Sequence, residues 1–291
     1  MTAIALASAA AELTRVEADG LLRLTLRKDR RGRTVISSRA HCFPLRMTVP
    51  LYLDELDPSM AFVHIQNPTG GVFPGDQLTV EVSAEREARV HIATQSATKL
   101  VRSDTGEKGI QTCWITVGPD AVIEMVPDAL IPHAGARYEQ RTTVELAVGG
   151  RFISCEILQP GRVGEFHRYR EIGLRTAIER NGRELCVDAT RFQPGTRPVA
   201  TPGLLGRYGY YASLTVAAPE DDMERLAAEL TGTLRLAQGV LAAAGALPGN
   251  CGVGARILGR DGETVRRTLR SAWGVARERL LGVPIPPLRK W

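Results

Sequence analysis

Carboxylates and small polar side chains that could hold a cation occur in four short stretches of the chain. The first, NPTGGVFPGD at residues 67–76, ends in Asp76. Its glycines and prolines could cradle a phosphate, surround a metal or turn the chain between two strands. No Lys-Ser or Lys-Thr pair follows, so this stretch is not a phosphate-binding P-loop. The pattern favours a sharp bend that places Asp76 at the entrance of a strand.

The other three stretches combine acids with histidine, arginine, lysine or hydroxyl side chains. They are TQSATKLVRS (94–103) with Thr94, Gln95 and Lys99, EMVPDALIPHAGARYEQR (124–141) with Glu124, Asp128, His133 and Arg137, and GRVGEFHRYRE (161–171) with Arg162, Glu165 and His167. Taken singly, each is explained equally well by turns and by cross-strand ion pairs.

Signatures of common enzymes are missing. No serine has glycines two residues away on both sides, and no histidine opens an H-E-x-x-H motif. The five cysteines form no C-x-x-C pair, which leaves zinc and redox motifs unsupported. Paired acids such as Glu124 and Asp128 could still act as general acid and base, so a carboxylate enzyme stays open as an alternative.

Charge and hydropathy exclude several classes of partner. The net charge of +5 comes almost entirely from arginines, without an aromatic-basic motif or a long basic run, so we expect no nucleic-acid partner. No run of about 18 apolar residues is present, so no helix is expected to span a membrane. The start MTAIALASAA lacks a basic region and predicts a flexible N-terminus over 1–19 rather than a signal peptide. Scattered cysteines, odd in number, indicate reduced thiols in a cytoplasmic protein.

Most of the chain is predicted to be β. Short apolar-alternating segments separated by turn residues are expected to form strands. The predicted strands are 21–26, 46–53, 61–66, 77–83, 88–94, 110–117, 121–126, 140–148, 151–158, 170–179, 184–190, 212–218 and one more within 249–259. Gly149-Gly150 is typical of a two-residue hairpin between two of these strands. The spacing predicts stacked antiparallel or mixed sheets, as a sandwich or a solenoid-like stack.

Two amphipathic helices are predicted in the C-terminal half. The first covers 220–245, where apolar residues recur at helical spacing from Met223 to Leu241. The second covers 261–281, with Asp261 as N-cap and Gly282 as stop signal. Both apolar stripes must be buried, and the β core is the simplest surface for them. We therefore expect one α+β domain, predominantly β, over 1–291.

Taken together and in order, the polar stretches resemble one protein family, the urease accessory protein UreD, also called UreH. The resemblance rests on RTVISSRAHCFPLRMTVPLYL, NPTGGVFPGDQLTVEV, TQSATKLVRS, EMVPDALIPHAGARYEQRTTVEL and GRVGEFHRYREI. The ending GVPIPPLRKW, with Trp291, is similar to the family's Pro-Arg-Trp tail. The resemblance covers roughly residues 20–291 and, as a set, its motifs are specific.

The resemblance implies a non-catalytic scaffold with a β-rich core and two helices. It implies partnership with UreF, with the GTPase UreG through UreF, and with apo-urease. It also implies passage of Ni²⁺ through an internal tunnel, with no tightly bound cofactor. The residues that match the family's motifs are Asp76, Glu124, Asp128 and Glu165 as transient nickel ligands, His133 and His167 as secondary ones, and Thr94, Gln95, Lys99, Arg137 and Arg162 as partner-binding or structural residues.

Oxygen ligands suit a passage because imidazole and thiolate clusters would bind nickel tightly and release it slowly. Conduction requires sites that are favourable to enter and weak enough to leave. On this hypothesis, replacing Asp76 or Glu165 by Ala lowers urease nickel while complexes still form. A pure interaction scaffold without nickel contact is the alternative, in which the same changes break partner binding.

Overall fold

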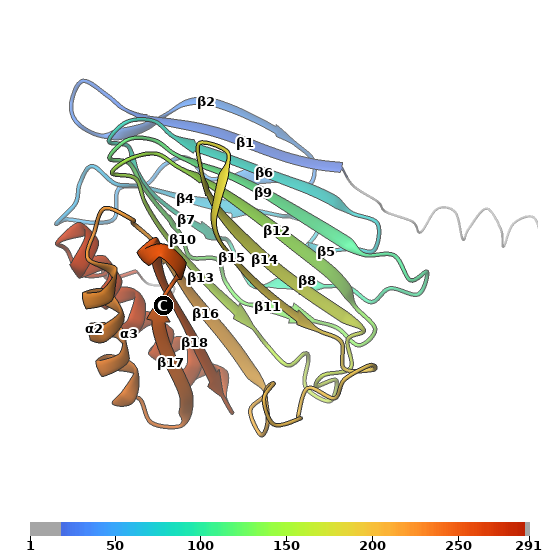
Figure 1. Ribbon diagram of the computed structural model, residues 1–291. Coiled ribbons are helices and arrows are strands. Elements are labelled where there is room, and N and C mark those ends of the chain that lie inside the picture. Colours follow the sequence, from blue (N-terminus) through green and yellow to red (C-terminus); the bar gives the residue numbers. More distant parts are fainter. Residues whose placement is uncertain (1–18, 289–291) are drawn as a thin grey trace, which may run out of the picture.

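Two stacked β-sheets with two helices on one outer face make up the protein. The computed structural model describes residues 19–288. The first sheet has seven strands, in the order β15 (Arg183–Phe192), β14 (Glu171–Arg180), β12 (Arg137–Leu146), β9 (Gly109–Val117), β6 (Gln77–Ala84), β1 (Asp19–Lys28) and β2 (Thr34–Cys42). The predicted class, predominantly β with stacked mixed sheets, is confirmed (Figure 1).

The second sheet has eleven strands. Its main path is β17 (Val240–Ala246), β18 (Gly252–Gly259), β16 (Tyr210–Ala217), β13 (Arg151–Leu158), β10 (Val122–Met125), β7 (Arg89–Thr94), β4 (Ala61–Gln66) and β3 (Arg46–Met47). Three short strands, β5 (Gly71–Val72), β8 (Thr98–Leu100) and β11 (Leu130–Pro132), extend it beside β13. The central strands of both sheets run parallel and the outer pairs run antiparallel.

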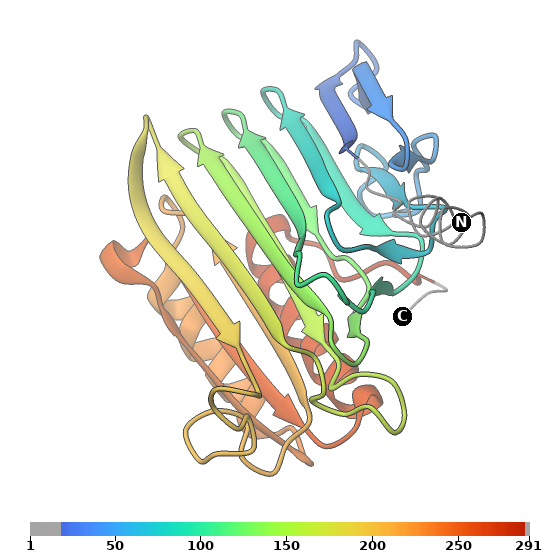
Figure 2. The same ribbon diagram turned by 90° about the vertical axis from the view of Figure 1, so that its right-hand side faces the viewer.

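The chain alternates between the sheets in solenoid-like coils. It passes from β6 in the first sheet to β7 in the second, then to β9, β10, β12 and β13. The hairpin predicted at Gly149-Gly150 is therefore wrong, because β12 and β13 belong to different sheets and do not pair. Gly149 has φ +73°, so the pair turns the chain from one layer to the other. Figure 2 shows the successive coils side by side.

Two hydrophobic cores hold the layers together. The first lies between the sheets, where Leu22, Val80, Ile115, Ile123 and Phe152 are buried. The second lies between the second sheet and the helices, and it contains Ile153, Leu214, Leu230, Leu269 and Trp273. Strand β13 serves both, because its alternate side chains point to opposite faces.

The helices are α2 (Met223–Arg235) and α3 (Gly262–Leu281), with the 3₁₀ turn η1 (Pro248–Asn250) between β17 and β18. Helix α3 matches its predicted range; Asp261 Oδ1 accepts the Thr264 backbone N–H at 2.8 Å, and Gly282 ends the helix with φ +72°. The helix predicted over 220–245 is too long. Gly239, with φ +78°, turns the chain, and Val240–Ala246 pairs with β18 instead. Leu241 is accordingly 57% exposed.

Near the N-terminal side, the strand predicted over 46–53 is reduced to β3 and a single bridge between Leu51 and Phe62. Pro50 lacks an N–H and cannot continue a ladder there. Strand β2 is not among the predicted strands. Within residues 19–288, no helix is long and apolar enough to cross a membrane.

A candidate cation site between the sheets

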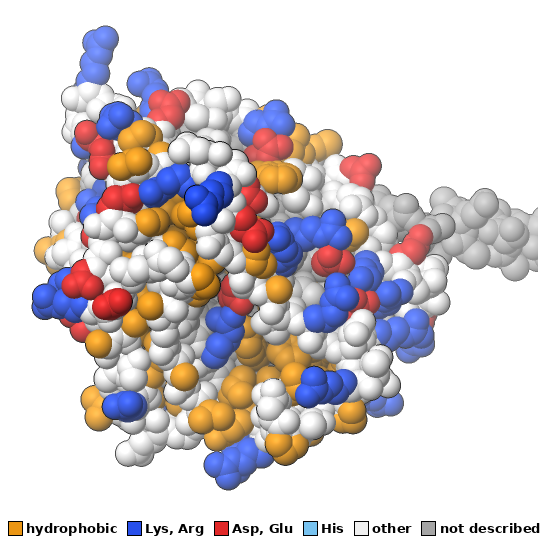
Figure 3. Space-filling model, in the orientation of Figure 1, with side chains coloured by type: hydrophobic (Ala, Val, Ile, Leu, Met, Phe, Trp, Pro, Cys, Tyr) orange, Lys and Arg blue, Asp and Glu red, His pale blue; other side chains and the backbone are white. Residues whose placement is uncertain are grey.

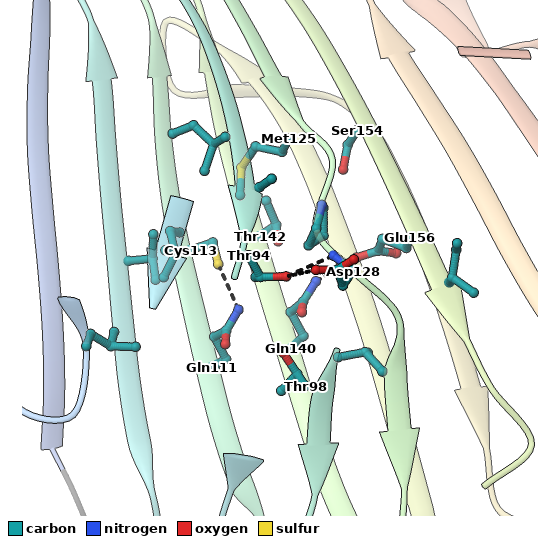
Figure 4. Close-up of a pocket in the computed structure, with 18 residues that line it drawn as sticks. Thr94, Thr98, Gln111, Cys113, Met125, Asp128, Gln140, Thr142, Ser154 and Glu156 are labelled. Atoms are coloured by element: carbon teal, nitrogen blue, oxygen red, sulfur yellow. Dashed lines mark hydrogen bonds between the residues drawn. The ribbon is translucent and has the colours of Figure 1, made fainter. Parts of the chain in front are cut away.

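A polar cavity lies between the two sheets. Two adjoining hollows, of about 70 Å³ and about 50 Å³, share Leu45, Ile65, Thr94, Thr98 and Gln111 in their walls. A space of this size holds several water molecules. Polar side chains from both sheets point into the larger hollow, among them Thr94, Asp128, Gln140 and Glu156 (Figure 4).

The glycine-rich loop forms the wall of the smaller hollow. Asn67, Gly70 and Gly71 line it together with Gln95 and Ser96. Asn67 Nδ2 donates to the Gly71 carbonyl at 2.8 Å, and Asn67 Oδ1 accepts the Thr69 N–H at 3.1 Å. A Cβ on Gly71 would come within 2.5 Å of the Lys99 carbonyl oxygen, so only glycine fits this approach. The loop thus lines one end of the cavity.

Thr94 and Asp128 form one polar unit in the cavity wall. The Asp128 backbone N–H donates to Thr94 Oγ1 at 2.9 Å, and Thr94 Oγ1 donates to Asp128 Oδ2 at 3.3 Å. Strand β7 ends at Thr94, and Asp128 follows β10, its parallel neighbour. Parallel strands end at the same edge, which brings the two residues together although 34 positions separate them.

Glu156 is the functional candidate that sequence reasoning missed. It projects from β13 into the cavity, where its carboxylate accepts from Gln140 Nε2 at 2.6 Å and from Ser213 Oγ at 3.4 Å. Burial and the nearby charge of Asp188 raise the pKa of Glu156 to about 7, although Arg256 opposes this effect. The available signal was the acid's position within β13, since Ile153, Cys155 and Ile157 fill the opposite face.

Cys113 is the thiol in the cavity wall. Burial raises its pKa to about 11, so the sulfur is protonated at neutral pH. Gln111 Nε2 donates to its Sγ at 3.6 Å. A neutral thiol is a poor metal ligand, because the thiolate is the binding form. The charged side chains in the wall of the larger hollow are therefore the carboxylates of Asp128 and Glu156.

Glu124 lies on the other face of the second sheet, under α3. It is fully buried, and its carboxylate accepts from Trp273 Nε1 at 3.0 Å and Arg277 Nε at 3.1 Å, with His91 Nδ1 at 3.1 Å. Burial alone would raise the pKa of Glu124, but the contacts with His91, Arg277 and Trp273 outweigh it and hold the pKa below its ordinary value. Glu124 and Asp128 thus lie on opposite faces of the second sheet and do not form the acid pair considered from the sequence.

Comparison with known proteins decides the family. A family model described as UreD urease accessory protein matches residues 18–291. The chain belongs to the UreD family. Similar relatives include the urease accessory protein UreD of Haloarcula marismortui, 34% identical over 94% of this chain and 91% of that protein. The UreD of Mycolicibacterium gilvum is 31% identical over 90% of this chain and 95% of that protein. UreD 2 of Brucella suis is 28% identical over 89% of this chain and 87% of that protein. A role in urease maturation follows from this membership.

Three other residues of the UreD motifs, Glu165, His133 and His167, lie in loops away from the cavity wall. Glu165 Oε2 accepts the Ala134 N–H at 3.0 Å, which with the neighbouring Arg162 lowers the pKa of Glu165. Burial and the charge of Arg162 lower the pKa of His133. Burial also lowers the pKa of His167, whose ring packs edge-on against Tyr169 and whose Nδ1 has no hydrogen-bond partner among the described residues.

The residues predicted to bind partners or to support the structure also fall into two groups, those that line the cavity and those that lie away from it. Thr94 and Gln95 line the cavity, whereas Lys99 is exposed on β8. Arg137 donates to Glu171 Oε2 at 3.0 Å and to the Gly106 carbonyl. Arg162 is largely exposed. Within residues 19–288, no group of three or more His, Cys, Asp or Glu side chains is placed to hold a metal ion. The tail residue Trp291 lies outside the described residues.

Asp76 is buried in the turn that it ends. Its side chain is 1% exposed, and Oδ2 accepts the Phe73 N–H at 2.9 Å. Its backbone carbonyl also accepts the Ile110 N–H at 2.8 Å, which ties the turn to β9. These contacts indicate that the Asp76 carboxylate fixes the loop beside the cavity.

Replacing Asp76 by Ala should therefore lower the free energy of unfolding by about 2 kcal/mol, because a buried carboxylate that accepts a backbone N–H is lost. Urea unfolding monitored by circular dichroism measures the change. Asp76→Asn keeps an acceptor oxygen and should lose less. An Ala variant as stable as the wild type would show that the carboxylate does not hold this turn.

Proposed function

We propose that this UreD-family protein is a non-catalytic urease maturation factor that carries Ni²⁺ in transit through the cavity between its sheets. It would act in the cytoplasm with UreF, with the GTPase UreG through UreF, and with apo-urease. The observation that carries the proposal is the polar cavity, in which Thr94, Gln140 and Glu156 project from facing sheets and Asp128 projects from the segment between β10 and β11.

The chemistry of the cavity suits a passage. Carboxylate, amide and hydroxyl oxygens bind a borderline cation more weakly than imidazoles or thiolates do. Cys113 is protonated, and His91 is bonded to Glu124 on the opposite face of the sheet, so neither would trap nickel. Of the four proposed carboxylate ligands, Asp128 is the one in the wall of the larger hollow. We therefore place the nickel contact at Asp128 and assign Asp76, Glu124 and Glu165 to holding the surrounding structure.

A scaffold role accompanies the passage. Exposed apolar side chains concentrate in one segment, with Phe43, Val49, Leu53 and Leu56 each more than two-fifths exposed. Such side chains are typical of protein-binding surfaces. The face in Figure 3 intersperses Lys and Arg with Asp and Glu and shows apolar side chains gathered in its lower part. Mixed charges of this kind agree with protein partners rather than nucleic acid.

Replacing Asp128 by Ala tests the passage. We expect urease matured with UreF, UreG and this variant at limiting Ni²⁺ to contain roughly tenfold less nickel, the scale on which metal affinity falls when a supporting group is lost. Nickel is measured by elemental analysis of purified urease, and complex formation by co-purification.

The matched control is Asp104→Ala, which removes an exposed carboxylate paired with Arg102. It should leave both measurements unchanged. A normal nickel content in urease matured with Asp128→Ala would contradict the proposed passage. If Asp128→Ala abolishes co-purification with the partners while urease still receives nickel, the pure scaffold is favoured.

A further inference from the structure

Polar side chains continue across the interior beyond the cavity, from strand to strand at paired positions. On the first sheet, Cys113 of β9 pairs with Thr142 of β12, which pairs with Thr176 of β14, and Thr176 pairs with Asp188 of the edge strand β15. Side chains at paired positions lie on the same face. The first sheet therefore carries one polar row from the cavity wall to its edge.

The second sheet carries a matching row. Glu156 of β13 pairs with Ser213 of β16, and Ser213 pairs with Arg256 of β18. Ser213 Oγ bridges toward the cavity by donating to Glu156 Oε2 at 3.4 Å. Starting from the larger hollow, both rows lead toward the side where β15 and β18 lie.

Burying these groups between sheets is costly. Thr142 is 5% exposed, Thr176 8% and Ser213 2%, and the neighbouring inward positions Leu174 and Ile178 on β14 are apolar. Hydroxyls in such a layer lose their hydration, whereas Val or Ala would pack without that loss. The polar rows are therefore not explained by the stability of the core.

An ion pair joins the two rows at their outer end. Arg256 Nη2 donates to Asp188 Oδ1, and the Arg256 guanidinium also lies 5.9 Å from the centre of the Tyr211 ring. The Arg256 side chain is 36% exposed and Asp188 22%, so the pair reaches solvent, and Glu156 lies behind it along the second-sheet row. Arg256 and Asp188 thus stand between the interior row and the surface.

We propose that the Arg256–Asp188 pair closes an opening of the inter-sheet cavity on the side away from the glycine-rich loop. The pair spans the two sheets at the β15–β18 side, and parting it uncovers the path through Ser213 and Thr176 to Glu156. A divalent cation at Glu156 repels Arg256 and competes with it for Asp188, so the cation itself weakens the closure. That the cargo is nickel rests on the proposed function; the opening itself does not.

Access to Cys113 tests the opening directly. The probe is methyl methanethiosulfonate, a small neutral thiol reagent, and modification of the Cys113 peptide is followed by mass spectrometry. Exposed Cys42 serves as the internal reference. Arg256→Met and Asp188→Asn should each speed Cys113 modification about tenfold, the factor that corresponds to roughly 1.4 kcal/mol of lost closure.

Arg175→Met is the matched control, because it breaks the exposed Arg175–Glu184 pair that also involves β15. It should leave the Cys113 rate unchanged. Folded Arg256→Met and Asp188→Asn proteins that react at the control rate would overturn the proposal.

If both variants fail to fold, the wild type decides by its salt dependence. Raising the salt concentration to roughly 1 M screens an ion pair that solvent reaches. The modification rate of Cys113 relative to that of Cys42 should then rise, and an unchanged ratio would overturn the proposal that the pair closes the cavity. Faster Cys113 modification in variants that still load urease with nickel normally would support the opening and count against nickel as its cargo.

Discussion

Replacing Arg277 by Met should lower the free energy of unfolding by about 3–5 kcal/mol, the cost of removing one partner from a buried ion network. Arg277 is fully buried in α3. Its Nη2 donates to Asp54 Oδ2 at 2.7 Å, and its Nε donates to Glu124 Oε1 at 3.1 Å. Without the guanidinium, two buried carboxylates lose their shared positive partner. Urea unfolding of the purified chain measures the loss.

The same substitution on the exposed side of α3 is the control. Arg266 pairs with Glu263 at the surface, so Arg266→Met should change stability by less than about 1 kcal/mol. Adding Glu124→Gln to Arg277→Met should destabilise by less than the sum of the single changes, because the charge left unpaired has been removed. An Arg277→Met protein as stable as the Arg266→Met control would show that the buried network contributes little.

This network shows where sequence reasoning stops. Glu124 and Asp128 belong to one motif, and spacing alone suggests one role for both. Strand alternation turns the Glu124 side chain away from the cavity and toward α3. The α3 partners that bury it lie about 150 positions later in the chain. Their distance along the chain gives no sign of the contact.

Local signals determine some elements and fail for others. The ends of α3 are predictable, because Asp261 and Gly282 act within one turn of the helix. The end of α2 is not. Leu241 continues the helical spacing by coincidence, and the alanine-rich segment around it favours helix, but pairing with β18 makes it a strand.

Local signals also mark the turns between strands, but they do not show which sheet the next strand joins. Gly149-Gly150 correctly marks a tight turn, yet nothing in two glycines tells whether the next strand returns beside the first or enters the other layer. Thr94 and Asp128 can be found because their motifs are distinctive. Glu156 is marked only by its place in a strand whose other face is apolar, and its partner Gln140 comes from the opposite sheet.

Replacing Glu156 by Gln should raise the free energy of unfolding by about 3 kcal/mol near pH 8, with little change near pH 4. The pKa rises from 4.5 in the unfolded chain to about 7 in the fold, and a pKa difference of one corresponds to about 1.4 kcal/mol. Because the folded protein holds the proton more tightly, this group's contribution to stability is fully present below pH 4.5. It is lost as the pH rises through 7. Glutamine keeps an acceptor for Gln140 and never acquires the charge.

Unfolding free energies of wild type and Glu156→Gln are compared at several pH values from about 4 to about 8. The comparison is needed because His133 and His167, with lowered pKa values, contribute stability that rises with pH over the same range. Taking the difference between the two proteins at each pH cancels the contribution of these histidines, because both proteins contain them. A flat difference for Glu156→Gln would show that the carboxyl is not desolvated. A difference that grows with pH means that the chain retains, at a cost to its own stability, an anion facing the cavity, which is the arrangement a cation passage requires.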